Sequence, residues 1–239
     1  DNTGPAISEL KHRPVLPAVN EAVTVTCRAR DPDGLAALVL EYRVDPSTNY
    51  QSVAMLDDGS GGDTLVGDGV YAAQIPGQAV NVIAAFRVKA VDSHASPAVS
   101  WFPSDDFYRD AVVRFGEPVP IGQFGTYICW MSSTNFITLT TRSSNNRHML
   151  AMTFAYGQHR AIYDGRIRFR SSNSYAGEFP KSERVLGNNE FKLDVPCGTG
   201  CQSGVLLKEH FSFWMARKAG FAASNPRYVQ VRVNGTSLV

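Results

Sequence analysis

Three arginines alternate with apolar residues in one short stretch of the chain. Arg166, Arg168 and Arg170 are separated by Ile167 and Phe169. Alternate side chains of a β-strand point to opposite faces, so this spacing predicts three guanidinium groups on one face of a sheet. A run rich in serine and asparagine follows at once. Cations beside hydroxyl groups and turn amides favour an anion such as phosphate, although a solvated strand face followed by a turn fits the same pattern.

A glycine-rich loop earlier in the chain carries four aspartates, Asp57, Asp58, Asp63 and Asp68. Carboxylates are the hard oxygen ligands that calcium prefers. The spacing does not match an EF-hand, which needs a closing glutamate. The other interpretation is a long hairpin connection in which the aspartates bond their own backbone. The sequence leaves both interpretations open.

The chain has four cysteines, and two of them lie in strand-like patterns. Cys27 has the same parity as Val23 and Val25, which predicts a small buried hydrophobe. Cys129 lies in a second strand-like run. Cys197 and Cys201 flank a Gly-Thr-Gly turn, and a local disulfide or free thiols fit this spacing better than zinc does, because no second ligand pair is nearby.

Composition and missing motifs exclude several classes of function. The formal net charge is +1, so the chain lacks the basic excess typical of nucleic-acid binding. No apolar run approaches the ~18 residues that a transmembrane helix needs. The sequence has no serine-hydrolase elbow, zinc-protease motif, Walker loop or dinucleotide fingerprint, and its five histidines are scattered. The first residues are typical of a domain entry or linker, and we expect the chain to be part of something longer.

Residues 1–115 have the pattern of an all-β domain. About seven short runs alternate with turn signals, which favours a fibronectin-III-like or immunoglobulin-like β-sandwich. The predicted strands are Ala6–Leu10, Ala22–Arg30, Leu38–Val44, Tyr50–Leu56, Val70–Ile75, Val82–Val91 and Ala111–Phe115.

Residues 116–124 are rich in turn residues and are predicted to link this domain to a second one, 125–239. Strands are expected at Tyr127–Met131, Phe136–Thr141 and Met149–Tyr156, with a polar loop over 142–147. Glycine turns are expected to interrupt the β-type runs that follow.

One amphipathic helix is expected after Cys201, with Ser203 as its N-cap and Gly220 at its end. Its apolar stripe contains Leu207, Phe211, Trp214 and Met215. A final strand with alternating valines leads to Asn234-Gly235, which is the strongest two-residue hairpin signal. The chain ends four residues later, so we expect truncation, because a half-made hairpin leaves an exposed edge.

At this point the second half resembles the CotH family of secreted, atypical protein kinases. Weak motifs in the right order carry the resemblance over about residues 125–239. They are Trp130, Ser143-Ser-Asn145, Met152-Thr-Phe-Ala-Tyr-Gly157, Arg160-Ala-Ile-Tyr-Asp-Gly165, Ile167-Arg-Phe-Arg170-Ser-Ser-Asn-Ser174, Phe191-Lys192-Leu-Asp194, the helix, and the final hairpin. The chain departs from the family where a glycine often follows the arginine, because Ser171 stands there.

The resemblance implies a mainly β chain in which a β-sandwich precedes the start of an α+β kinase domain. It implies ATP and a divalent metal as cofactors, and a secreted or surface protein phosphorylated on Ser or Thr as the substrate. Arg168, Arg170 and Lys192 become the expected phosphate contacts. The family's metal-binding aspartates lie downstream, so we expect this chain alone to be inactive and its parent to act at the cell surface or outside the cell. The alternative is a non-catalytic surface or adhesion protein built from β modules.

Overall fold

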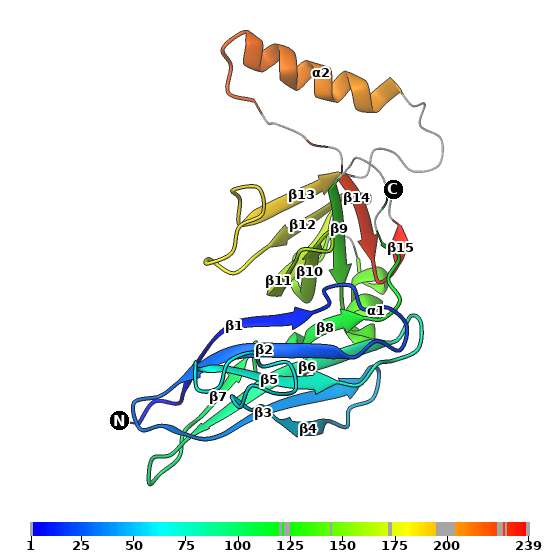
Figure 1. Ribbon diagram of the computed structural model, residues 1–239. Coiled ribbons are helices and arrows are strands. Elements are labelled where there is room, and N and C mark those ends of the chain that lie inside the picture. Colours follow the sequence, from blue (N-terminus) through cyan, green and yellow to red (C-terminus); the bar gives the residue numbers. More distant parts are fainter. Residues whose placement is uncertain are drawn as a thin grey trace.

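A computed structural model describes residues 2–119, 121, 125–143, 145–171, 174–194, 204–223, 227 and 229–237. The chain is mainly β, with several antiparallel sheets and two α-helices in the described part. Two small sheets are formed by residues up to Arg114, and we call them the N-terminal sheets. A seven-stranded sheet is formed after Gly125, and we call it the C-terminal sheet (Figure 1). The mainly β prediction is therefore confirmed.

The N-terminal sheets face each other across a shared core. One has the strand order β1-β2-β5, and the other has the order β4-β3-β6-β7, with β8 also paired to β6. Their strands are β1 (Ala6–Arg13), β2 (Val23–Arg30), β3 (Leu35–Val44), β4 (Gln51–Ala54), β5 (Val70–Ile75), β6 (Ile83–Asp92), β7 (Val99–Phe102) and β8 (Ala111–Arg114), with a short 3-10 helix, η1 (Phe107–Arg109), before β8.

All seven strands predicted for this part are present, with ends that differ by up to three residues. The sequence patterns missed β7, which is only four residues long and is bounded by Pro97 and Pro103. The parity argument for β2 is confirmed, because Val23, Val25 and Cys27 all point into the core and Cys27 is a free thiol.

The C-terminal sheet curls into a half-barrel with the strand order β13-β12-β11-β10-β9-β14-β15. Its strands are β9 (Gly125–Trp130), β10 (Leu150–Tyr156), β11 (Arg160–Ser171), β12 (Ser174–Glu178), β13 (Glu190–Asp194), β14 (Val229–Val233) and β15 (Thr236–Ser237). Neighbouring strands are antiparallel except β14 and β9, which are parallel. The strand β14, near the end of the chain, therefore packs beside β9, the first strand of this sheet in the sequence.

One predicted strand is wrong. Residues Phe136–Thr141 belong to a helix, α1 (Ser133–Thr141). Its start is fixed from two sides, because the Ser132 hydroxyl accepts from the Asn135 amide at 3.3 Å and the Asp45 carboxylate accepts from the Ser133 amide at 2.8 Å. These caps satisfy amides that a helix leaves unpaired. Tertiary capping thus overrides the β-branched composition of the segment.

One of the glycine positions expected to interrupt the β-type runs does not do so, because Asp164 and Gly165 both lie inside β11. The pairing of β11 with β10 shifts register here, and Asp164 has a φ of 53°. The irregularity is a β-bulge, which re-aims side chains without ending the strand. It directs Asp164 to Arg109 on η1, where two oxygens accept from Nη2 at 2.7 and 2.9 Å.

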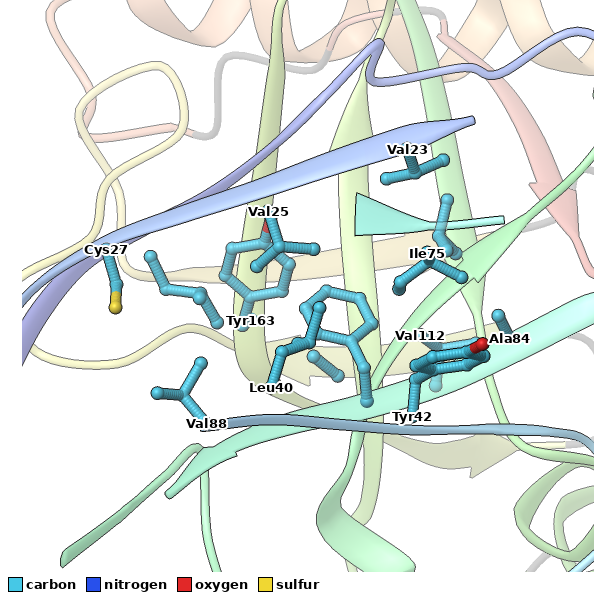
Figure 2. Packing of buried hydrophobic residues seen from close by; sticks show 14 of the residues in the cluster. Val23, Val25, Cys27, Leu40, Tyr42, Ile75, Ala84, Val88, Val112 and Tyr163 are labelled. Carbon is cyan, nitrogen blue, oxygen red and sulfur yellow. The ribbon is translucent and has the colours of Figure 1, made fainter. Parts of the chain in front are cut away.

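The two parts of the chain share a hydrophobic core. The cluster that fills the space between the N-terminal sheets also contains Ile128, Trp130, Ala155 and Tyr163 from the C-terminal sheet. Figure 2 shows the Tyr163 ring from β11 among side chains of the N-terminal core. A second cluster lies on the opposite face of the C-terminal sheet and includes Phe154, Ile162 and Ile167.

The remaining helix, α2 (Gly204–Lys218), lies beyond the end of the C-terminal sheet in Figure 1. The helix prediction is confirmed, and Gly220 follows its end with a φ of 84°. The predicted cap Ser203 and the pair Cys197 and Cys201 fall outside the described residues. Neither helix of the described part is long and apolar enough to cross a membrane.

The predicted hairpin at the end of the chain is present. Asn234 and Gly235 both have positive φ, 46° and 82°, as a type I′ turn requires. A Cβ atom at position 235 would also meet the Arg114 guanidinium, so the Arg114 side chain would have to move to accommodate it. The Asn234 side chain bonds both the amide and the carbonyl of Met131, which fixes the turn to the end of β9.

Candidate anion-binding site

On β11, the alternating arginines and apolar residues lie on opposite faces of the C-terminal sheet, as predicted. Ile167 is fully buried in the second cluster, and Phe169 packs against it. Arg166 and Arg168 alternate with them, with Arg166 exposed and Arg168 half-buried. The cationic side chains are therefore on the face opposite the apolar cluster, as the period of two predicts.

Arg168 and Lys192 are brought together by strand register. Arg168 on β11 pairs with Ala176 on β12, and Ala176 pairs with Lys192 on β13. Directly paired residues of antiparallel strands project from the same face, so the three side chains form one cross-strand row. Two strand spacings put the outer backbones about 10 Å apart. We call this set the cationic row, and both long side chains can lean over the small Ala176 toward one ligand.

Arg166 belongs to a different row. It pairs with Glu178, which pairs with Glu190, so two carboxylates share its face. The Arg166 Nη1 lies 3.8 Å from the Glu178 Oε1, with both side chains about half exposed. Of the alternating arginines, Arg166 therefore faces acids that oppose anion binding, whereas Arg168 shares its row with a second cation.

Arg170 lies where the β11–β12 pairing is irregular, between the pairs at Phe169 and Ser171. Its side chain is exposed and already interacts with a neighbour. The serine and asparagine run predicted to be a turn contributes its last residue, Ser174, to β12, and residues 172 and 173 fall outside the described part. The structure therefore joins Arg168 and Lys192 by register and leaves Arg170 one step further along the strand.

A further arginine that the sequence patterns missed lies near Arg168. Arg142 directly follows α1, and its Nε and Nη2 atoms are buried without a hydrogen-bond partner. Burial lowers the pKa of Arg142, and the positive charge of Arg168 lowers it further. The two residues are 26 positions apart, and only tertiary structure brings them together. In the sequence, Arg142 appears merely as the start of a polar loop.

The aspartate loop lies in the N-terminal part, away from these arginines in the chain. Oxygens of Asp57, Asp63 and Asp68 lie within 4.8 Å of one another, and this is the one group of metal-ligating side chains in the described part. Asp58 is not in the group and instead accepts from the amide and hydroxyl of Ser60.

Backbone amides surround these carboxylates. Asp57 accepts from the amides of Gly67, Asp68 and Gly69, with distances of 2.7 to 3.2 Å. Asp63 accepts from the amide of Gly59 at 2.6 Å. The aspartates thus bond the backbone of their own loop, as in the alternative to calcium. The loop is not a hairpin between paired strands, because β4 and β5 belong to different sheets and only an isolated bridge between Leu56 and Ala72 closes it. The same three carboxylates are the ones that could hold a calcium ion.

Comparisons with known proteins add no assignment. No family model matches the chain, and no curated protein matches it.

Proposed function

We propose that this chain is the N-terminal part of a secreted CotH-like atypical protein kinase, with a fibronectin-III-like or immunoglobulin-like sandwich in front of the nucleotide-binding start of the kinase domain. Arg168 and Lys192 are the principal phosphate contacts, and Arg170 is a third. The cationic row is the single observation that supports this proposal best. The order of motifs along the sequence supports it independently.

The chemistry that these residues supply is charge neutralisation. Phosphoryl transfer depends mainly on positioning and on cations that hold the phosphate oxygens. A planar guanidinium and a mobile ammonium on one face provide two such cations. In the described residues, the group of carboxylates that could hold a metal lies in the N-terminal part, and no such group accompanies the cationic row. Phosphate binding, and not metal-assisted transfer, is the role assigned to the described part of the C-terminal sheet.

The test compares ATP binding among single variants of the same sheet face. We expect Mg-ATP to raise the melting temperature of the wild-type chain. Because a charge-assisted hydrogen bond contributes about 1.5–3 kcal/mol, Arg168→Ala and Lys192→Ala should each weaken ATP binding by about tenfold or more. Arg166→Ala is the matched control, since its row contains Glu178 and Glu190. It should leave the affinity unchanged.

A non-catalytic surface module is the second candidate. The observation in its favour is that the cationic row lacks a neighbouring group of metal-ligating carboxylates among the described residues. That interpretation predicts no thermal protection by Mg-ATP, and no difference between Arg168→Ala and Arg166→Ala in any nucleotide titration. Equal behaviour of these two variants would reject the phosphate-binding role of the row.

A further inference from the structure

Two nitrogen atoms of the partly buried Arg142 side chain combine burial with missing hydrogen-bond partners. Its backbone amide ends α1 by donating to the Thr138 carbonyl at 3.2 Å. Its Nε and Nη2 are out of contact with solvent and have no acceptor. A buried donor without a partner costs about 1–3 kcal/mol, and more when the group is charged. Stability of the fold alone does not account for a guanidinium held in this way.

The positive charge of Arg168 adds to that cost. Arg168 is close enough to Arg142 to lower its pKa by repulsion, after the larger effect of burial. No carboxylate in the described part forms an ion pair with either guanidinium. The Nη1 of Arg168 donates instead to the Phe169 carbonyl, at 3.0 Å. The two guanidinium groups thus repel each other, and within the described residues no carboxylate is ion-paired with either of them.

The two unpartnered atoms of Arg142 define the geometry of a ligand. Nε–H and Nη2–H point the same way from the planar guanidinium and form its bidentate edge. This edge matches two oxygens of a phosphate or carboxylate group. Two uncompensated arginines call for a ligand that carries two negative charges, which favours a phosphoryl group over a carboxylate.

We propose that Arg142 is an additional anion-binding residue, which holds a phosphoryl group through its Nε and Nη2 edge together with Arg168. This inference rests on the proposed function, because it extends the cationic row to a third side chain from a different element. The phosphoryl group would supply the acceptor that the edge lacks and would separate the two like charges. Arg142 thus raises the free energy of the folded chain when the site is empty and lowers it when a phosphoryl group is bound.

The proposal predicts opposite effects on stability and on binding. Arg142→Met keeps the length of the side chain and removes both the charge and the unpartnered donors. We expect the unliganded variant to melt at the same temperature as the wild type or higher. Inorganic phosphate and Mg-ATP should each bind the variant about tenfold more weakly or worse. A residue with a purely structural role would lower the melting temperature when replaced.

Two further variants complete the design. Arg142→Lys keeps the charge but loses the bidentate edge, so it should recover only part of the affinity. Arg147→Ala removes an exposed arginine from the same loop and should change neither property. Binding is measured by calorimetric titration of the purified chain with inorganic phosphate, and separately with Mg-ATP.

The outcomes separate this inference from the proposed function. If Mg-ATP binds and depends on Arg168 and Lys192 but is unaffected by Arg142→Met, the role of Arg142 is overturned and the proposed function stands. If inorganic phosphate binds through Arg142 while Mg-ATP does not bind at all, the anion site stands and the nucleotide function falls. If neither ligand binds the wild type, both are overturned.

Discussion

At the residue scale, His12 is the side chain whose environment most constrains its protonation. It is buried between the N-terminal sheets and the C-terminal sheet, where its Nδ1 lies 2.6 Å from the Tyr163 hydroxyl and its Nε2 lies 3.1 Å from the Val15 carbonyl. The carbonyl can only accept, so Nε2 carries the proton, and Nδ1 accepts from Tyr163. Both ring nitrogens are therefore satisfied in the neutral form.

The pKa of His12 is lowered from 6.5 to about 4, mainly by burial and also by the nearby Arg13, against the opposing effect of the Val15 hydrogen bond. The folded protein therefore binds fewer protons than the unfolded chain between these values. The contribution of neutral His12 to the free energy of unfolding is fully present above pH 6.5 and is lost as the pH falls toward 4. Linkage gives a loss of about 2 kcal/mol between pH 7.5 and pH 5 from this group.

Urea unfolding of the wild type and of His12→Gln at these two pH values measures the effect. The variant should be less stable at pH 7.5 but should lose about 2 kcal/mol less on going to pH 5. His148→Gln removes an exposed histidine and should keep the wild-type pH dependence. Equal pH dependence in all three proteins would show that the imidazole of His12 is not kept neutral by the fold.

At the scale of the element, the two helices differ in how their side chains contact the rest of the chain. In α1, the start is capped, and threonine hydroxyls bond the carbonyl four residues earlier, as Thr138 does to Thr134 at 2.8 Å. In α2, the described side chains of the predicted apolar stripe are largely exposed. Phe211, Trp214 and Met215 are 56, 44 and 50% exposed, and the first two stack on each other with ring centroids 5.6 Å apart.

This difference predicts contrasting effects of two tryptophan substitutions. Trp130 on β9 is fully buried and donates to Glu117 at 3.3 Å, so Trp130→Ala should cost about 3–5 kcal/mol of unfolding free energy. Trp214→Ala should change it by no more than about 0.5 kcal/mol, because an exposed side chain has little packing to lose. Chemical denaturation of both variants measures this. A loss at Trp214 as large as the loss at Trp130 would show that α2 packs against the rest of the chain.

Local steric fit matters within the sheets as well. Gly177 on β12 pairs with Phe191 on β13, and a methyl group at this glycine would collide with the Phe191 ring. The ring covers the glycine and packs with Phe154 and Phe179 in the second cluster. Sequence periodicity marks Phe191 as apolar but does not show that its ring must pack over a glycine on the neighbouring strand.

At the scale of the whole molecule, the two parts of the chain are held together by polar as well as apolar contacts. The Val112 amide on β8 donates to the Thr153 hydroxyl on β10 at 2.7 Å, and both residues are buried. Arg109 and Asp164 form a bidentate ion pair across the same junction. The Asp45 carboxylate reaches from the end of β3 to the start of α1. We therefore expect the described parts to unfold in one cooperative transition.

A matched pair of threonines tests the polar part of this junction. Thr153→Val removes the acceptor of a buried amide and should cost about 1–3 kcal/mol. Thr126 is also buried, but its hydroxyl has no partner, so Thr126→Val should be neutral or slightly stabilising. Scanning calorimetry measures both, and each variant should show a single transition. A separate transition for each part, with Thr153→Val altering only one of them, would contradict the expected cooperativity.

The sequence alone determined most strands, because alternation of apolar and polar side chains follows directly from the period of the β-strand. It located β2, β5 and β14, the Asn234-Gly235 turn, and the opposite faces taken by Arg168 and the apolar residues beside it. It also identified the aspartate loop as a candidate calcium site. In the structure, Asp57, Asp63 and Asp68 lie close together, and Asp58 does not belong to this group. These features depend on residues close together in the chain, where local geometry is sufficient.

Tertiary structure decided the features that depend on residues far apart in the chain. The start of helix 133–141 is capped by Asp45, which is 88 positions away in the chain, and the carboxylate of Asp164 at the bulge meets Arg109. Lys192 joins Arg168 only through the register of three strands, and Arg142 approaches Arg168 only after α1 has packed. Side-chain periodicity specifies a face, but strand register and long-range packing determine which residues meet on it.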